Sequence, residues 1–201
     1  MNARRWSVVA LWLLAVGALV ASGWSHLRPS VAARTRATDI ADLKAPDMGG
    51  EAFPAGLALP MLAPYRAAWG ERLEFDAYRG SLPMVVDVWA SWCPPCVREA
   101  PLLEAAWLRL SNRVQFVGVN YRDQRADALA FLDEYALTFP SGEDAAGSTT
   151  DELRIFGLPT TLFIDASDRI VGQKIGELDE ATLDRLTGRA IGGSRGKDAA
   201  P

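Results

Sequence analysis

Apolar residues in the middle of the chain switch between the spacing of strands and the spacing of helices. Two short valine-rich runs carry apolar side chains on both faces, which is typical of strands in a sheet that is covered on both sides. Each run is followed by apolar residues at helical spacing, such as Leu102, Leu103 and Ala106 after the first. The predicted order is a strand at residues 84–89, a helix at 97–110, a strand at 114–119 and a helix at 127–135.

The pattern changes in the last third of the chain. Thr149-Thr150-Asp151-Glu152 fits a capping box and predicts a short helix that begins there. Residues 161–165 and 170–175 are strand-like runs around a short Ala-Ser-Asp-Arg stretch, which predicts a hairpin. A final helix is predicted over residues 179–190, with Asp179 as its N-cap. This order predicts an α/β fold with a mixed central sheet flanked by helices.

The first 24 residues have the pattern of an export segment. Nineteen residues from Trp6 to Trp24 carry no charge, and Arg4 and Arg5 precede them. As a helix this run rises about 28 Å, close to the roughly 30 Å core of a bilayer. We therefore predict a transmembrane signal anchor at residues 1–24, with the remaining chain on the periplasmic side of a bacterial inner membrane. A cleaved signal peptide, which would release a soluble periplasmic protein, stays open as the alternative.

Composition divides the rest of the chain and excludes some functions. Residues 25–54 show no steady period and are predicted to be a linker, residues 55–190 the folded domain, and residues 191–201 a flexible tail. The net charge of −4 gives no support for nucleic-acid binding. One histidine and two cysteines cannot supply the usual four ligands of zinc, so no metal is expected.

The two cysteines, Cys93 and Cys96, stand between the first predicted strand and the helix that follows it. A helix N-terminus offers free N–H groups and about half a positive charge, which stabilise a thiolate. The thiolate is the nucleophile in disulfide exchange, and the second cysteine is close enough to resolve a mixed disulfide. Cys93, on an exposed first turn, is expected to attack, and Cys96, one turn further in, to resolve.

Two other interpretations of the cysteine pair carry less weight. A structural disulfide that closes so short a loop removes little entropy from the unfolded chain. A metal site would need a second pair of ligands. The expected redox group is therefore the Cys93–Cys96 disulfide itself, with no further cofactor.

The residues around the pair resemble a known family. Residues 86–96, ending in Trp-Cys-Pro-Pro-Cys, are similar to the active-site segment of thioredoxins, and Gly157-Leu158-Pro159-Thr160 resembles the cis-proline loop of that superfamily. The match is closer to the exported TlpA/ResA/CcmG (DsbE-type) branch, and Asn120, Tyr121 and Asp123 lie in a stretch similar to it. The 63 positions from Cys96 to Pro159 leave room for a helix-and-strand insertion around residues 121–150, as in this branch.

The resemblance implies a thioredoxin-like fold over roughly residues 55–190 and further site residues. Asp87 would be a buried acid that exchanges a proton with Cys96, and Glu99 a second acid near the site; a partly solvated Asp87 and a solvated surface Glu99 stay open as alternatives. Pro159 would be cis and would place backbone beside Cys93. The implied client-binding residues are Trp92, Pro94, Pro95, Leu158 and Pro159.

The direction of electron flow is predicted from the two prolines between the cysteines. Neither Pro94 nor Pro95 has an N–H to give the Cys93 thiolate, which leaves the amides of Cys96 and Val97. A charged Glu99 would disfavour the thiolate further. Because a less stabilised thiolate means a better reductant, a protein-disulfide reductase is expected.

The resemblance also implies partners. The clients would be exported disulfide proteins, with apocytochrome c as the particular candidate, and electrons would come from a membrane donor such as a thiol transporter. Two other functions stay open, which are a peroxide reductase on a related fold and an exported binding or chaperone module on the same scaffold. The peroxidase is disfavoured because Cys93 does not stand in a Thr-x-x-Cys setting.

Overall fold

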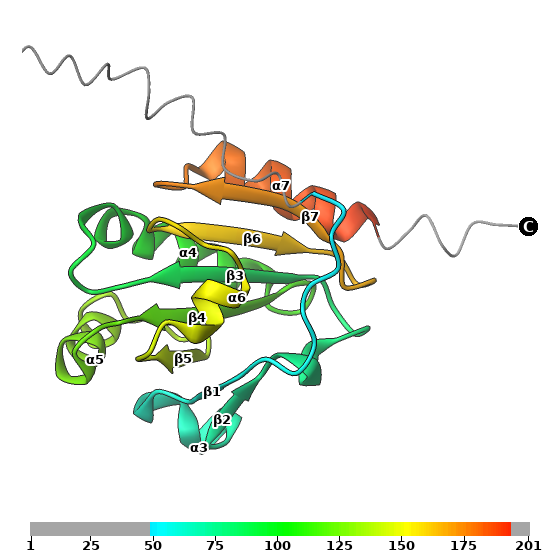
Figure 1. The fold of residues 1–201 in the computed structure, drawn as a ribbon. Helices are drawn as coiled ribbons and strands as arrows, with labels where there is room; N and C mark the ends of the chain where they lie inside the picture. The colour runs from blue at the N-terminus through cyan, green and yellow to red at the C-terminus, as the bar shows by residue number, and fades with distance from the viewer. Residues whose placement is uncertain (1–48, 194–201) are drawn as a thin grey trace, which may run out of the picture. The chain divides into compact units, whose positions relative to one another are not determined.

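The structure, a computed structural model, describes residues 49–193. Its centre is a five-stranded mixed sheet (Figure 1). The strand order is β5-β4-β3-β6-β7, with β3 parallel to β4, β4 parallel to β5, and the remaining pairs antiparallel. The strands are β3 (Met84–Trp89), β4 (Gln115–Tyr121), β5 (Ser141–Asp144), β6 (Thr160–Ile164) and β7 (Ile170–Ile175). The predicted mixed α/β fold is thus confirmed.

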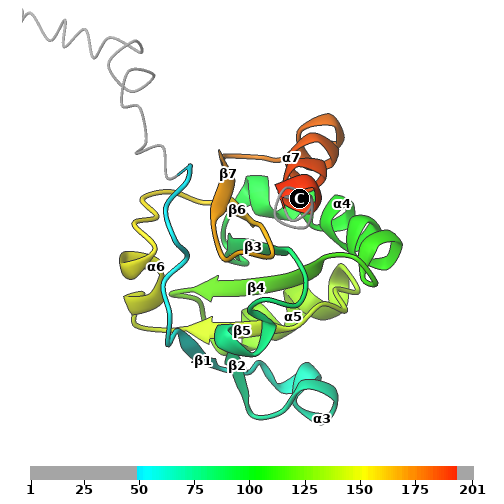
Figure 2. The ribbon, with the colours of Figure 1, turned by 90° about the vertical axis from the view of Figure 1, so that its right-hand side faces the viewer.

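Helices cover both faces of this sheet, as Figure 2 shows. Those on one face are α4 (Pro94–Leu110), α5 (Arg125–Glu134) and α7 (Glu180–Gly193), and α6 (Ser148–Glu152) lies on the other. Right-handed crossovers from β3 to β4 and from β4 to β5 place α4 and α5 on the same face. The predicted helix-and-strand insertion is α5 with β5. β3 is the central strand and is buried along its whole length, so the cysteine pair that follows it lies at the end of the central strand.

The two predicted helix starts have different outcomes. Asp179 caps α7 as predicted, because its carboxylate accepts hydrogen bonds from the amide and hydroxyl of Thr182, both at 2.8 Å. The predicted capping box of α6 is wrong. The helix begins at Ser148, and its first turn is held by Asp144, which accepts from the amide and hydroxyl of Thr150 at 2.8 and 2.7 Å. The cap is supplied from the end of β5, so the local sequence of the helix does not show it.

A small hairpin, β1 (Ala58–Pro60) and β2 (Arg72–Glu74), packs beside β5 and was not predicted. Its connection holds a 3-10 turn (Ala63–Tyr65) and the short helix α3 (Arg66–Trp69), and a second 3-10 turn (Phe75–Tyr78) follows β2. The hairpin approaches β5 closely at Gly142, where a Cβ atom would lie 2.7 Å from that of Leu59. Any larger residue at this position would therefore push the hairpin away.

The domain extends beyond its predicted ends. Ala52 bridges Arg169, and the amide of Phe53, a buried residue, donates to the Asp168 carbonyl at 2.8 Å. The last residues of the predicted linker therefore belong to the fold, because they pair with backbone beside β7. At the other end α7 continues to Gly193, into the predicted tail.

The predicted signal anchor and most of the predicted linker, residues 1–48, lie outside the described residues, as do residues 194–201. Within residues 49–193, none of the helices is both long enough and apolar enough to span a bilayer.

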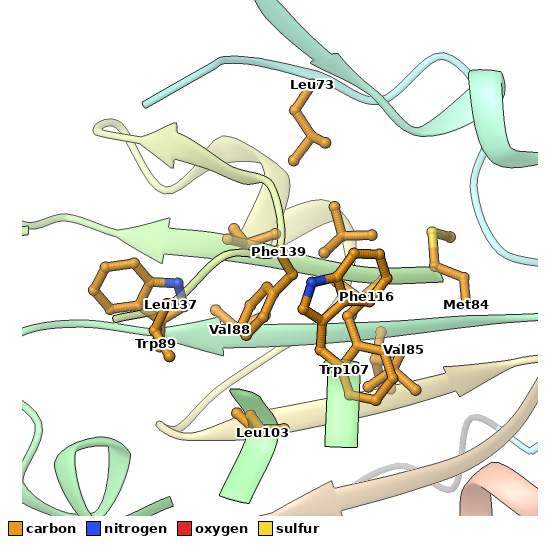
Figure 3. Close-up of a cluster of buried hydrophobic side chains, with 14 of the residues drawn as sticks. Leu73, Met84, Val85, Val88, Trp89, Leu103, Trp107, Phe116, Leu137 and Phe139 are labelled. Atoms are coloured by element: carbon orange, nitrogen blue, oxygen red, sulfur yellow. The ribbon is translucent and has the colours of Figure 1, made fainter. Parts of the chain in front are cut away.

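Aromatic side chains fill the core between the sheet and α4 (Figure 3). Phe116 on β4 contacts Trp107 on α4 and Phe139, with ring centroids 6.0 and 6.2 Å apart. Trp89, at the end of β3, stacks on Phe131 of α5 with centroids 4.6 Å apart. Such pairs add about 0.5–1.5 kcal/mol each beyond their burial. This packing fixes the β3 end and α4, which together carry the cysteines.

Candidate active site

The cysteine pair lies where β3 leaves the sheet and α4 begins. The chain turns at Ala90, whose carbonyl accepts from the Cys93 amide at 3.2 Å, and the helix starts at Pro94. Proline at the first helical position has no N–H to leave unpaired, and its fixed φ suits a helix start. Cys93 and Cys96 form a disulfide across the first turn, with Cα atoms 5.3 Å apart. The sulfurs are thus held together at the positive end of α4.

One backbone amide serves the Cys93 sulfur. The Cys96 amide donates to Cys93 Sγ at 3.4 Å. The Val97 amide, the second donor expected from the sequence, donates instead to the Cys93 carbonyl at 3.2 Å as part of the helix. That expectation is wrong because the regular helical hydrogen bond uses the Val97 N–H. The Cys93 sulfur therefore has one amide donor, which is fewer than the two expected from the positions of the prolines.

Cys93 is not on an exposed turn. Its exposed fraction is 3%, against 1% for Cys96, so the predicted contrast in residue exposure is wrong. The difference between the two lies in access, because Cys93 lines an open pocket and Cys96 is not among the pocket's lining residues. Of the two cysteines, Cys93 is therefore the one that is accessible from the pocket.

The pocket has a volume of about 480 Å³ and lies between the Cys93 turn and the loop before β6. Four of the five predicted client-binding residues, Trp92, Pro94, Pro95 and Leu158, line it, and Pro159 does not. Cys93 and Gly157 also line the pocket. The remaining lining residues were not predicted from the sequence, and they are Tyr121, Thr150, Asp151, Ile155 and Phe156. Phe156 is 83% exposed and Trp92 57% exposed, so two large, exposed aromatic side chains line the same pocket as Cys93. The adjacency of Phe156 to the Gly-Leu-Pro loop was the available signal.

Pro159 ends the loop that precedes β6 and does not line the pocket. The Leu158–Pro159 peptide bond is cis, as the resemblance implied. Pro159 is buried, and its carbonyl accepts from the Gly176 amide at 2.8 Å, which ties the loop to the end of β7. Leu158, the residue before the proline, is half-buried and lines the pocket.

Asp87 lies inside the sheet, on β3 and six residues before Cys93. Its side chain is 3% exposed and has one weak partner, the Thr161 hydroxyl, which donates to Oδ1 at 3.3 Å. Burial disfavours the charged form and raises the pKa of Asp87 to about 7, against a smaller lowering by Thr161. The buried location predicted for Asp87 is confirmed, and its carboxyl can exchange a proton near neutral pH.

Glu99 is also buried, with 2% of its surface exposed, which excludes the alternative of a solvated surface acid. Its Oε2 accepts from the Leu178 amide at 2.7 Å, and its Oε1 has no hydrogen-bond partner among the described residues. Burial, and then repulsion from Asp87, raise the pKa of Glu99 to about 9. Glu99 is therefore neutral at pH 7, so its predicted repulsion of the thiolate does not operate there.

A mixed sheet of this topology, with a Cys-x-x-Cys disulfide opening the helix after the central strand and a cis-proline loop beside it, defines a thioredoxin-like disulfide-exchange domain. The sequence profile of the AhpC/TSA family matches residues 50–173, and the chain belongs to that family.

Curated relatives carry names of thiol–disulfide exchange proteins. The chain is 33% identical over 135 residues to the thiol:disulfide interchange protein DsbE of Pseudomonas fluorescens biotype C, covering 66% of this chain and 70% of the relative. It is 35% identical over 106 residues to the thiol-disulfide oxidoreductase ResA of Oceanobacillus iheyensis, covering 52% of this chain and 54% of the relative. The chain thus spans little more than half the length of some relatives, and the resemblance to the ResA/DsbE branch is confirmed.

Solved structures show the same fold. A secreted disulfide oxidoreductase of Mycobacterium tuberculosis superimposes with a TM-score of 0.56 at 24% identity, covering 68% of this chain and 95% of that one. A thiol:disulfide interchange protein of the thioredoxin family from Chlorobium tepidum gives 0.59 at 22% identity, covering 70% and 97%. At these identities the likeness supports the fold and no finer property.

Proposed function

We propose that this chain is an exported thiol–disulfide oxidoreductase whose reduced Cys93–Cys96 pair reduces disulfides in protein clients. The observation that carries the proposal is the disulfide at the start of α4, with only Cys93 opening into a pocket between exposed aromatic side chains. The names of the curated relatives support the same chemistry.

The reaction needs two exchange steps. The Cys93 thiolate attacks one sulfur of a client disulfide, which forms a mixed disulfide and releases the other client sulfur as a thiolate. The Cys96 thiolate then attacks Cys93 Sγ, forms the Cys93–Cys96 disulfide and releases the second client thiol. Two electrons pass to the client, and an external thiol donor must reduce the pair again.

The second step requires Cys96 to lose a proton in a buried place. Asp87, with its pKa near neutrality, is the proposed acceptor for that proton, and it returns the proton when the pair is reduced. Glu99 shares the helix face of Cys96 three residues on, and as a neutral acid it limits the negative charge around the sulfur. Both roles rest on burial and on the raised pKa values.

The direction proposed is reduction of the client. With one amide at 3.4 Å and two prolines beside it, the Cys93 thiolate receives little stabilisation, which favours the disulfide form of this protein. The family resemblance supports apocytochrome c as the first client to test and a membrane thiol transporter as the donor. It also supports a location on the periplasmic side of the inner membrane, held by residues 1–24.

A trapping experiment tests the proposal. Cys96→Ala removes the resolving thiol, so Cys93 should stay linked to its client as a mixed disulfide that mass spectrometry identifies. Cys93→Ala in the same background is the matched control and should trap nothing. A Cys96→Ala variant that captures no exported disulfide protein, or a redox titration giving a strongly oxidising potential, would count against a reductase.

Peroxide reduction remains a second candidate because the matching family profile is that of AhpC/TSA. Ala90, however, occupies the position three residues before Cys93, and an apolar side chain cannot donate a hydrogen bond to a peroxide. Direct peroxide consumption by the purified reduced protein, at a rate matching disulfide exchange, would favour this candidate instead.

A further inference from the structure

Asp123 is the most heavily hydrogen-bonded side chain beside the cysteine turn, and the proposed chemistry does not use it. It lies in the loop between β4 and α5. Its Oδ1 accepts from the Ser91 hydroxyl at 2.7 Å and the Gln124 amide at 2.9 Å. Its Oδ2 accepts from the Ser91 amide at 2.6 Å and the Asn120 side-chain amide at 2.9 Å. Four hydrogen bonds match the full acceptor capacity of a carboxylate.

These bonds hold the residues that lead into Cys93. Ser91 donates hydrogen bonds to Asp123 through both its backbone amide and its hydroxyl. Trp92 is held more weakly by the same loop, because its indole Nε1 donates to the Arg122 carbonyl at 3.4 Å. Both residues between Ala90 and Cys93 are therefore attached to the β4–α5 loop.

The loop is itself fixed to the edge of the sheet. The Arg122 amide donates to the Asp144 carbonyl and its Nε to the Ala146 carbonyl, both at 3.1 Å. Arg122 also has a positive φ of 43°, which an arginine keeps only when its surroundings impose it. Asp123 thus connects the turn before Cys93 to a loop that is hydrogen-bonded to the edge of the sheet.

We propose that Asp123 is a positioning residue that keeps Cys93 Sγ within reach of Cys96 in the reduced protein. The inference rests on the proposed disulfide exchange and concerns the pair's own equilibrium, so it is tested without a client. When the turn is held, the two thiols have a high effective concentration and the disulfide is favoured. Without Asp123 the turn samples more positions, the disulfide is less favoured, and the protein becomes a weaker reductant.

The test is a redox titration of the full chain in a dithiothreitol buffer. Asp123→Ala is expected to lower the equilibrium constant for disulfide formation about tenfold, equal to a potential about 30 mV less negative. Asp123→Asn should give a smaller change in the same direction, because one of its two oxygens becomes an amide nitrogen that cannot accept. This milder variant keeps the test valid if the alanine variant folds poorly.

Asp165→Ala is the matched control. Asp165 holds a turn in the same way, since its Oδ1 accepts from the amides of Ser167 and Arg169 at 2.8 and 3.1 Å. That turn joins β6 to β7 at the end of the sheet away from Pro159 and contributes nothing to the pocket. We expect it to lose stability in chemical denaturation and to keep the wild-type redox equilibrium.

A double-mutant cycle with Ser91→Ala locates the effect. Ser91→Ala alone should move the equilibrium in the same direction, and it should add little once Asp123 is alanine. The proposal is overturned if both Asp123 variants stay within twofold of the wild-type equilibrium constant, or if Asp165→Ala shifts it equally. A wild-type pair that exchanges with no disulfide at all would instead remove the proposed function.

Discussion

Two pairs of buried carboxyl groups show how differently this domain treats its acids. The redox-end pair, Asp87 and Glu99, has one hydrogen bond each, at 3.3 and 2.7 Å. In the β5-side pair, Glu104 accepts from the amide and hydroxyl of Thr138. Asp144, the other β5-side acid, accepts from two amides and a hydroxyl at the start of α6. All four side chains are at most 8% exposed, so burial alone does not separate the pairs.

The number of donors separates them instead. The β5-side acids accept two or three hydrogen bonds each and hold the chain before β5 and at the start of α6, which is a structural use of a carboxylate. The redox-end acids accept only the one hydrogen bond each given above, and desolvation raises their pKa values. A buried acid with few partners is suited to holding and releasing a proton. The difference between the pairs can be tested by removing members of each.

The largest effect is expected at the redox end and depends on pH. A carboxyl with a raised pKa binds its proton more tightly in the folded state, so stability falls as the pH rises from about 4 toward the raised value. With a pKa of about 7 for Asp87, Asp87→Asn should raise the free energy of unfolding at pH 8 by about 2–4 kcal/mol and have less effect at pH 4. Urea denaturation over pH 4–9 measures this.

The same variant should slow the exchange reaction. Loss of a proton acceptor for Cys96 is expected to reduce the rate of the resolving step by about 10–100-fold at pH 7. Asp151→Asn, at an exposed carboxyl on α6, is the control for stability and should leave its pH dependence unchanged. If wild type and Asp87→Asn lose stability in parallel as the pH rises, the distinction between the pairs fails.

A smaller and opposite effect is expected on the β5 side. Asp144→Ala leaves buried donors of Thr149 and Thr150 unpaired at the start of α6, which should lower the free energy of unfolding by about 2–3 kcal/mol. The loss should be nearly constant from pH 6 to 8, in contrast to the behaviour of Asp87→Asn. Denaturation curves at these pH values check it, and a gain in stability would contradict the structural assignment.

The smallest change in stability is predicted for Phe156, at the redox end but on the surface. Because its side chain is 83% exposed, Phe156→Ala should change the free energy of unfolding by about 0.5 kcal/mol at most. If the pocket binds clients, KM for a disulfide client should rise several-fold while kcat stays within about twofold. Leu108→Ala, at an exposed residue of α4 that does not line the pocket, is the control, and an equal KM in both variants would exclude Phe156 from client binding.

The sequence predicted best where many residues agreed. β3 was predicted with the bounds it has in the structure, because a valine-rich run with apolar residues on both faces is typical of a central strand. The Cys-x-x-Cys motif indicated disulfide exchange. The hairpin of β1 and β2 was missed because strands of three residues are too short to show alternation. The cap of α6 comes from the end of β5, and the burial of Glu99 depends on contacts across the fold. Local spacing carries no information about such contacts.

The chain before the central sheet forms two isolated backbone bridges, Ala52 to Arg169 and Met61 to Gly142. The first lies beside the outer edge of β7 and the second on the outer edge of β5, so one stretch of chain crosses the α6 face of the sheet and meets both margins (Figure 1). Unpaired strand edges are templates on which other chains add strands and aggregate. This stretch pairs with backbone at the start of β7 and with the first residues of β5, so at those two places the margins are already occupied and cannot accept a strand from another chain.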